Sequence, residues 1–320
     1  MKLMNLKSVF FNENGRLRSG LRFVIFLLSY FILSLVAIGL AVTILMQLPV
    51  GFSQQSLLGF TVPFAISSAV AIFLGWLYGK LFEDLPFRAL GTWFTKNWLK
   101  DLFFGLVFGT FSIVFAAIIA YLFGGMQFER NQNSGFVAIG LTLIFTLLIF
   151  TVGAIAEELL FRGYLLQTLS RAKIFWVGLV LTSFLFATAH NSNPGANVFT
   201  WTNTFLAGVW LAVSYYKTRT LWFPFGVHFA WNWVQGAFLG INVSGLSELA
   251  SAPVLRVTQT GNRFIGGGDY GIEGGIACTV ALIVSTALIY FSPFLKPTEE
   301  MLRLTSEEIS KDDLNRLNLE

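Results

Sequence analysis

The chain alternates between long apolar runs and short polar connectors. An α-helix needs about 20 apolar residues to cross a bilayer, and eight runs approach or exceed that length. They occupy residues 21–46, 57–78, 102–123, 136–169, 175–190, 197–216, 221–241 and 272–295. Only helices or closed barrels satisfy their backbone groups inside a membrane. We therefore predict an all-α, polytopic membrane bundle of about eight transmembrane helices.

The polar segments divide the chain into a membrane domain and two flanks. Residues 1–20 form a basic N-terminal segment, 21–295 a single transmembrane domain with its functional core at about 136–241, and 296–320 a charged tail. The first apolar run is far longer than the apolar part of a cleavable signal peptide. A polar, Gly-rich stretch covers 242–270, and the glycines at 266–268 and 274–275 are expected to lie in a flexible loop. The Thr305–Glu308 pattern predicts the start of a short amphipathic helix.

Composition excludes several classes of protein. Hydrophobic residues make up 55% of the chain and charged residues only 12%, which is untypical of a soluble globular protein. The single cysteine, Cys278, excludes an internal disulfide framework and a cysteine-rich metal site. The net charge of +4 does not indicate nucleic-acid binding, because in a membrane protein the placement of the cations carries the information.

That placement predicts an orientation. All but three of the 21 Lys and Arg residues fall on the side that would hold both termini, and the exceptions are Arg130, Arg256 and Arg263. Positively charged residues accumulate on the cytoplasmic side of membrane proteins. We expect both termini in the cytoplasm, in a multi-pass protein of a cell membrane, such as the bacterial plasma membrane. The lipid bilayer is then a partner, and nucleic acid is not.

Two adjacent carboxylates, Glu157 and Glu158, interrupt the fourth apolar run, and Arg162 follows them. An ionisable side chain inside a membrane span is costly and marks a functional site by default. Glu158 and Arg162 lie four residues apart on one helical face and can form an ion pair. Glu157 points about 100° away from Glu158. We expect one paired acid and one acid free to react, the alternative being a solvated helix end.

The two histidines of the chain lie in later apolar runs. Phe186 and His190 lie four positions apart, as do His228 and Asn232, so each pair shares a helical face. An interhelical hydrogen bond would explain either histidine alone. Their occurrence together with two acids, an arginine and an amide favours one shared site.

The three blocks Glu-Glu-x-x-x-Arg, Phe-x-x-x-His and His-x-x-x-Asn resemble, in kind and order, the motifs of a known family. It is the CAAX protease and bacteriocin-processing family of intramembrane endopeptidases (CPBP, also called Abi), which includes the type II CAAX prenyl endopeptidases. The resemblance covers roughly residues 150–240. It implies hydrolysis of peptide bonds in membrane-associated peptide or protein substrates. Eukaryotic members remove the last three residues of prenylated proteins.

The resemblance also implies roles for individual residues. Glu157, helped by His190, would activate a water molecule, since a desolvated carboxylate suits general-base catalysis near neutral pH. His228 and Asn232 would donate hydrogen bonds to the oxyanion of the tetrahedral intermediate. The remaining motif residues would orient this group from behind; they are Glu158, Arg162 and Phe186.

A metal-dependent reaction is the alternative mechanism. Glu157, His190 and His228 could ligate zinc and leave a fourth position open for water. The His-Glu-x-x-His helix of the soluble zinc proteases is absent from the chain. We therefore prefer water activation without a cofactor.

Two other classes of function compete with the peptidase. Buried Glu and His residues could form the relay of a proton-coupled transporter, although the chain shows no paired repeat of broken helices. A non-catalytic membrane immunity or scaffold protein could carry the same residues for structure.

The depth expected for His228 in the membrane does not agree with a site that it shares with Glu157 and His190. Glu157 and His190 lie about 14 and 17 residues from the hairpin that joins their helices, and so at similar depth. His228 follows its own turn by about seven residues and is expected to lie shallower, unless Pro224 marks a non-helical entry.

Overall fold

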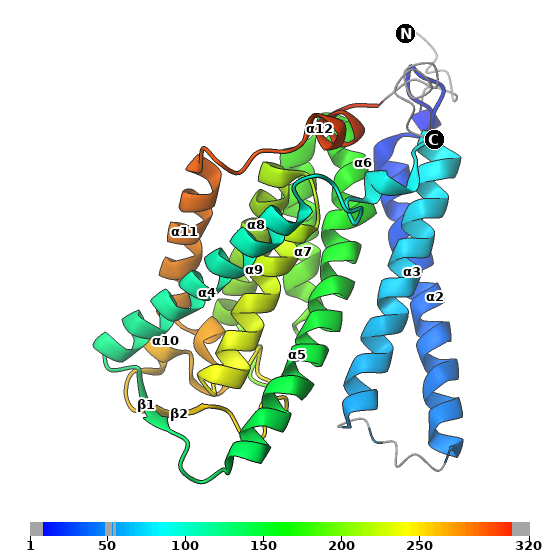
Figure 1. Cartoon of the computed structure of the whole chain (residues 1–320). Coiled ribbons are helices and arrows are strands. Elements are labelled where there is room, and N and C mark those ends of the chain that lie inside the picture. The colour runs from blue at the N-terminus through cyan, green and yellow to red at the C-terminus, as the bar shows by residue number, and fades with distance from the viewer. Residues whose placement is uncertain (1–8, 49–52, 54–55, 309–320) are drawn as a thin grey trace.

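The computed structural model describes residues 9–48, 53 and 56–308. Within these residues the chain is a bundle of long helices with one small sheet, which confirms the predicted all-α membrane bundle (Figure 1). Each predicted apolar run falls on a helix. The helices are α2 (Ser19–Gln47), α3 (Leu57–Glu83), α4 (Trp98–Leu122), α5 (Phe136–Glu158), α6 (Leu165–Arg171), α7 (Phe175–Ala189), α8 (Val198–Thr218), α9 (Trp222–Trp233) and α11 (Ile276–Phe291).

In the described part of the chain, four helical segments are long and apolar enough to cross a membrane, which makes this a multi-pass membrane protein. They are Ser19–Gln47, Leu57–Glu83, Trp98–Leu122 and the continuous Phe136–Arg171. Helices α7 and α11 are apolar but shorter. The full count of eight spans remains a prediction.

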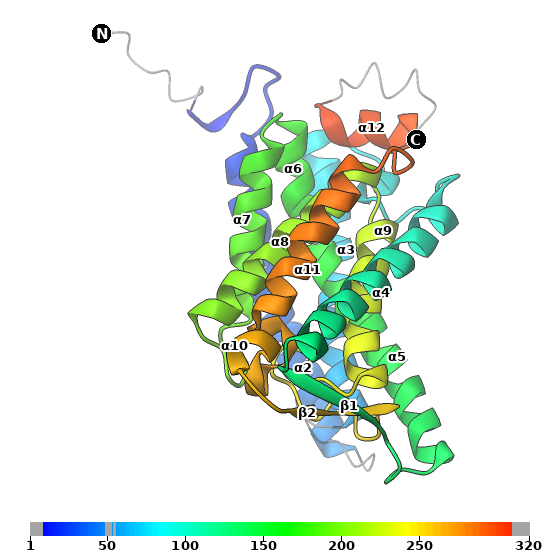
Figure 2. The ribbon, with the colours of Figure 1, turned by 90° about the vertical axis from the view of Figure 1, so that its left-hand side faces the viewer.

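The bundle has two distinct ends. The terminal end carries the start of α2, α6 and the short helix α12 (Glu299–Ser306), which lies across it (Figure 2). The far end carries α10 (Arg263–Gly266) and the antiparallel strands β1 (Met126–Arg130) and β2 (Leu255–Gln259), which pair Met126 with Gln259. The three arginines that were expected on the side opposite the termini, Arg130, Arg256 and Arg263, all lie in these far-end elements. Their position agrees with the predicted orientation.

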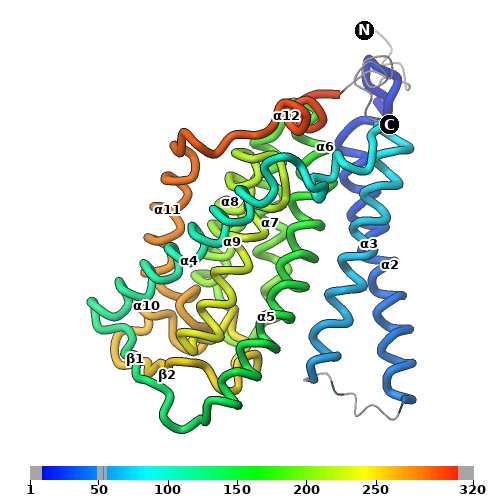
Figure 3. Tube along the Cα trace, in the orientation of Figure 1, coloured from blue at the N-terminus to red at the C-terminus, as the bar shows by residue number. Residues whose placement is uncertain are grey.

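Helices α2 and α3 form a hairpin that is anchored mainly at the terminal end. The buried residues of α2 all fall between Arg22 and Ser34, and none lies in the last three turns. Arg171 donates two hydrogen bonds to the Glu83 carboxylate, at 2.8 and 3.0 Å, and Arg22 contacts the same group. Toward the far end the hairpin stands apart from α5 (Figure 3).

Glycines set the position of α9 against α4. A Cβ on Gly105 would lie 2.4 Å from the Phe223 carbonyl oxygen, and a Cβ on Gly109 would lie 2.3 Å from that of Val227. Small residues four apart let membrane helices approach closely. Because Val227 precedes His228, this contact fixes the depth and rotation of the second histidine.

The segment 241–275 differs from the flexible loop expected from its glycines. It contains β2, α10 and two short 3₁₀ turns, η4 (Gly268–Tyr270) and η5 (Ile272–Gly274), and it buries Val243, Tyr270 and Ile272. Its glycines allow close approach: a Cβ on Gly245 would lie 2.1 Å from the Pro194 carbonyl oxygen. The segment is therefore packed against the bundle as a cap.

The tail prediction was wrong in its position. The helix begins at Glu299, where the side chain of Thr298 accepts a hydrogen bond from the Met301 amide, and it ends at Ser306. Thr305 thus lies in the last turn and not at a helix start. The residues expected to continue that helix beyond Glu308 lie outside the described part of the chain.

Candidate active site

The two acids lie where a long helix changes its winding. Helix α5 ends at Glu158, a wider π-type turn, η2, covers Leu159–Tyr164, and α6 follows after a kink at Gly163 (φ −71°, ψ −127°). Such turns recur at functional sites. Every residue from 158 to 171 is buried, whereas Glu157 keeps a quarter of its side chain exposed.

Glu158 is the acid held by the arginine, as the spacing predicted. Arg162 Nη1 donates to Glu158 Oε1 at 3.1 Å, and both side chains are about 1% exposed. His228 Nδ1 donates to the same oxygen at 2.9 Å. A carboxylate accepts hydrogen bonds only, so Glu158 places the proton of His228 on Nδ1 and leaves Nε2 facing away.

That second nitrogen faces the other acid. His228 Nε2 lies 3.7 Å from Glu157 Oε2, too far for a direct hydrogen bond and within the span of a bridging water. Glu157 Oε2 has no hydrogen-bond partner among the described residues. The geometry therefore presents a basic nitrogen and a carboxylate oxygen on either side of one small gap.

His190 is the C-terminal capping residue of α7 and is oriented by its own helix. Its Nδ1 donates to the Phe186 carbonyl at 2.8 Å, which leaves Nε2 available. The Phe186 ring has its centre 4.8 Å from that of His190 and 6.1 Å from that of His228. The Arg162 guanidinium lies 4.7 Å from the same ring centre. Phe186 thus packs among the other motif residues.

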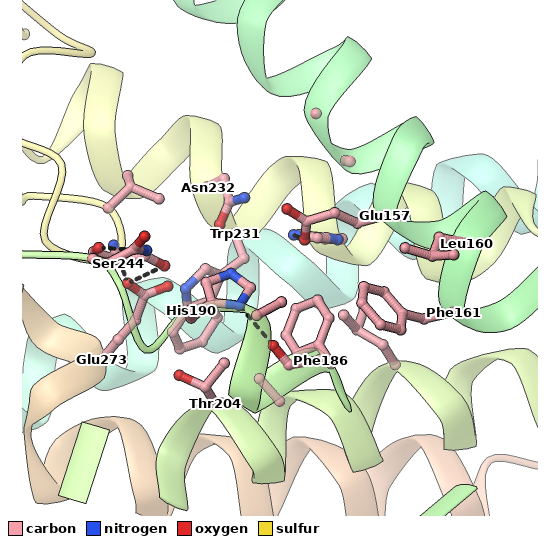
Figure 4. A pocket seen from close by; sticks show the side chains of 18 of the residues that line it. Glu157, Leu160, Phe161, Phe186, His190, Thr204, Trp231, Asn232, Ser244 and Glu273 are labelled. Atoms are coloured by element: carbon pink, nitrogen blue, oxygen red, sulfur yellow. Dashed lines mark hydrogen bonds and ion pairs between the residues drawn. The ribbon is translucent and has the colours of Figure 1, made fainter. Parts of the chain in front are cut away.

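One cavity of about 690 Å³ collects the polar groups. Glu157, His190, His228 and Asn232 all line it, with apolar walls from several helices. Figure 4 shows Glu157, His190 and Asn232 around the same space. The structure thus brings together the four residues proposed as catalytic, with Glu158, Arg162 and Phe186 beside them.

The expectation that His228 would lie shallower than Glu157 is wrong. Helix α9 starts below the terminal surface, because the connector after α3 folds into the bundle. The Leu221 amide donates to the Gly91 carbonyl, and Gln167 donates to the neighbouring Leu90 carbonyl at 2.9 Å. Pro224 lies in the first turn of α9, where a missing amide proton costs little. The count from the sequence assumed that the helix began at the membrane surface.

Sequence reasoning missed a second carboxylate in the cavity wall, beside that of Glu157. Glu273 lines the same cavity and accepts hydrogen bonds from the amide and hydroxyl of Ser244 (Figure 4). Asn193, three residues after His190, donates to the Ser244 carbonyl at 3.0 Å. Glu273 thereby ties the cap to the loop behind His190. Its place at the start of the predicted run 272–295 was the signal that could have identified it.

The predicted zinc ligands do not fit a metal centre in this arrangement. Among the described residues, no group of three His, Cys, Asp or Glu side chains could hold one metal ion. The Nδ1 atoms of His190 and His228 are bonded to protein acceptors, so only their Nε2 atoms are available to a ligand. Whether the reaction uses a metal stays a prediction from the sequence.

Comparison with known proteins supports the family resemblance. Residues 139–234 match the family described as type II CAAX prenyl endopeptidase Rce1-like. This range contains both acids, the arginine and both histidines of the site. Comparison with curated protein sequences gives no match.

Proposed function

We propose that the chain is an intramembrane endopeptidase that hydrolyses peptide bonds of membrane-associated substrates, because residues 139–234 match the Rce1-like family of type II CAAX prenyl endopeptidases. The observation that carries the proposal is the 3.7 Å approach of Glu157 Oε2 to His228 Nε2 at the wall of the cavity.

Water activation is assigned to this pair. A water that lies beside the two atoms and is hydrogen-bonded to both gives its proton to Glu157 or His228 as its oxygen attacks the substrate carbonyl. Glu158 and Arg162 keep the imidazole in the tautomer that accepts a proton at Nε2. His228 thereby joins Glu157 in the role that the family resemblance suggested for His190.

Residues on the opposite side of the cavity are assigned to stabilise the negative charge that develops on the substrate carbonyl oxygen. The Asn232 amide and, in its protonated form, His190 Nε2–H can donate to the oxyanion. The C–N bond then breaks, and the proton taken from water passes to the leaving amine. The second proton of the water also passes to the amine as the new acid ionises, so the products are a carboxylate and an ammonium group, and no other reactant is consumed.

The test compares the membrane peptides of cells that produce wild-type protein, Glu157→Gln or Glu129→Gln. Glu157→Gln should abolish the cleaved peptides at unchanged protein abundance, because the amide keeps the shape and removes the base. Glu129 is exposed in β1, so Glu129→Gln controls for loss of an acid and should cleave normally.

Two outcomes would contradict the peptidase. If Glu157→Gln cleaved normally but lost proton-coupled ion flux, the transporter would be favoured. If no peptide differed between the wild-type protein and Glu157→Gln, a non-catalytic immunity or scaffold protein would be favoured.

A further inference from the structure

Substrate can reach the site only from an end of the bundle that packed residues do not close. Between the cavity and the terminal end, residues 158–171 are all buried. The Glu83 carboxylate and its two arginines lie above them, and Ser170 donates to the Thr305 carbonyl of α12 at 2.8 Å. Buried side chains and hydrogen-bonded ion pairs therefore close this end, and a peptide cannot pass through it.

The cavity extends instead toward the far end. Its lining includes Phe60 and Phe64, near the start of α3, and Leu246 and Leu249 from the cap. Leu246 is 37% exposed. The weakly anchored half of the α2–α3 hairpin and the cap both border this part of the cavity.

Depth leads to the same conclusion. Helix α7 has 15 residues and is about 22 Å long, shorter than the roughly 30 Å of hydrocarbon in a bilayer. Helix α7 begins two residues after the exposed Lys173 of the terminal end, so the loop after His190 lies within the membrane thickness, yet Asn191 and Ser192 are exposed. Non-helical backbone at that depth requires surrounding protein or a water-filled space. Because the terminal end is plugged, this water enters from the far end.

The predicted orientation assigns each end of the bundle to one side of the membrane. All but three of the 21 cationic residues fall on the terminal side of the predicted spans, which makes that end cytoplasmic. The far end, with the three exceptions, then faces the extracytoplasmic side.

We infer that water and substrate reach the site from the extracytoplasmic side of the membrane. The substrate is a membrane-anchored peptide whose scissile bond lies in the outer half of the bilayer or at its outer surface. A cytoplasmic C-terminal tail does not fit this path. The inference rests on the proposed peptidase function for the identity of the substrate, but the access path can be tested without cleavage.

The experiment uses the full-length protein, in which Cys278, the one native cysteine and a buried one, is replaced by serine. A single cysteine is then introduced at each test position, so that the reagent reacts only there. Ser192→Cys probes the far-end loop, Leu249→Cys the cavity wall, and Lys173→Cys the terminal-end hairpin, where the lysine side chain is 75% exposed. A membrane-impermeant maleimide is added to intact cells. We expect Ser192→Cys and Leu249→Cys to be labelled, and Lys173→Cys to be labelled only after permeabilisation.

Cleavage supplies the second measurement. Labelling Leu249→Cys from outside should abolish cleavage, and labelling Lys173→Cys after permeabilisation should leave it intact. Outside labelling of Lys173→Cys, or protection of both far-end cysteines, would overturn the inference whether or not any peptide is cleaved. Absence of cleavage in unlabelled protein would count against the proposed function alone.

Discussion

At the scale of single residues, the adjacent acids Glu157 and Glu158 have different environments, because successive side chains of a helix point about 100° apart. Glu158 points into the protein and meets Arg162 and His228, whereas Glu157 points into the cavity. A buried ion pair is strongly destabilised by removal of one partner, since the other is left as an unpaired charge. This difference makes the two acids separable by mutation.

Arg162→Ala should lower the free energy of unfolding by about 3–5 kcal/mol and abolish cleavage, because it leaves Glu158 buried without its cation. Adding Glu158→Gln should restore part of the stability and none of the activity. Thermal unfolding of purified protein and peptide cleavage measure the two effects.

The exposed pair of Lys173 and Glu307 is the control for that comparison. Lys173→Ala should change stability by no more than about 1 kcal/mol, as exposed ion pairs do. A double mutant no more stable than Arg162→Ala would show that the loss does not come from a stranded carboxylate.

At the scale of elements, the site depends on how close α9 lies to α4. The contact uses glycines on α4 because any side chain there would meet the backbone of α9. His228 and Asn232 are carried by α9, so a displacement of this helix moves both away from Glu157. Catalytic geometry tolerates little displacement, and an error of about 1 Å can cost about 10²-fold in rate.

Gly109→Ala should therefore reduce cleavage by about 10²-fold or more and also lower the folded yield. The added methyl would lie 2.3 Å from the Val227 carbonyl oxygen and force the helices apart. Gly140→Ala is the matched control, because a Cβ at Gly140 in α5 meets nothing within 4 Å. Normal cleavage by folded Gly109→Ala protein would be evidence against this positioning role.

At the scale of the whole molecule, the terminal end is held together by charges from distant parts of the chain. Arg22 of α2 contacts both Glu83 and Glu308, and Glu308 also accepts hydrogen bonds from Asn12 and Asn14. The tail, the N-terminal segment and α3 therefore meet at one arginine. This connection closes the end of the bundle opposite the cavity opening.

Acid should weaken that closure. Partial burial acts to raise the pKa of Glu308, but hydrogen bonds from Arg22 and Asn14 and the charge of Arg22 outweigh it and lower the pKa below its ordinary value of 4.5. A lowered pKa stabilises the fold above the ordinary value, and this contribution is lost as the pH falls through the lowered pKa. Glu308→Gln should reduce the unfolding temperature at pH 7, and its difference from wild type should shrink as the medium becomes more acidic.

Glu307→Gln is the control for the tail, because the pair that Glu307 makes with Lys173 is long, at 3.6 Å, and exposed. It should unfold like the wild-type protein at every pH. A Glu308→Gln difference that stayed constant into the acid range would mean that charge on Glu308 does not hold the tail.

The sequence by itself determined the helices and the chemistry-bearing residues. Membrane helices are encoded locally, since about 20 apolar residues satisfy their backbone only as a helix. The Glu158–Arg162 pair was also predictable, because four-residue spacing is a property of one helix. The family motifs added the grouping of both histidines with the acids.

Only the tertiary structure decided which residues meet across the bundle. Glu158 and His228 are 70 positions apart, and their contact depends on the depth at which α9 begins, which Gly91 sets through Leu221. The packing of the Gly-rich cap and the place of Glu273 in the cavity wall likewise depend on contacts between distant segments. Hydropathy and helical period describe each segment alone, so they carry no information about how far one helix starts below another.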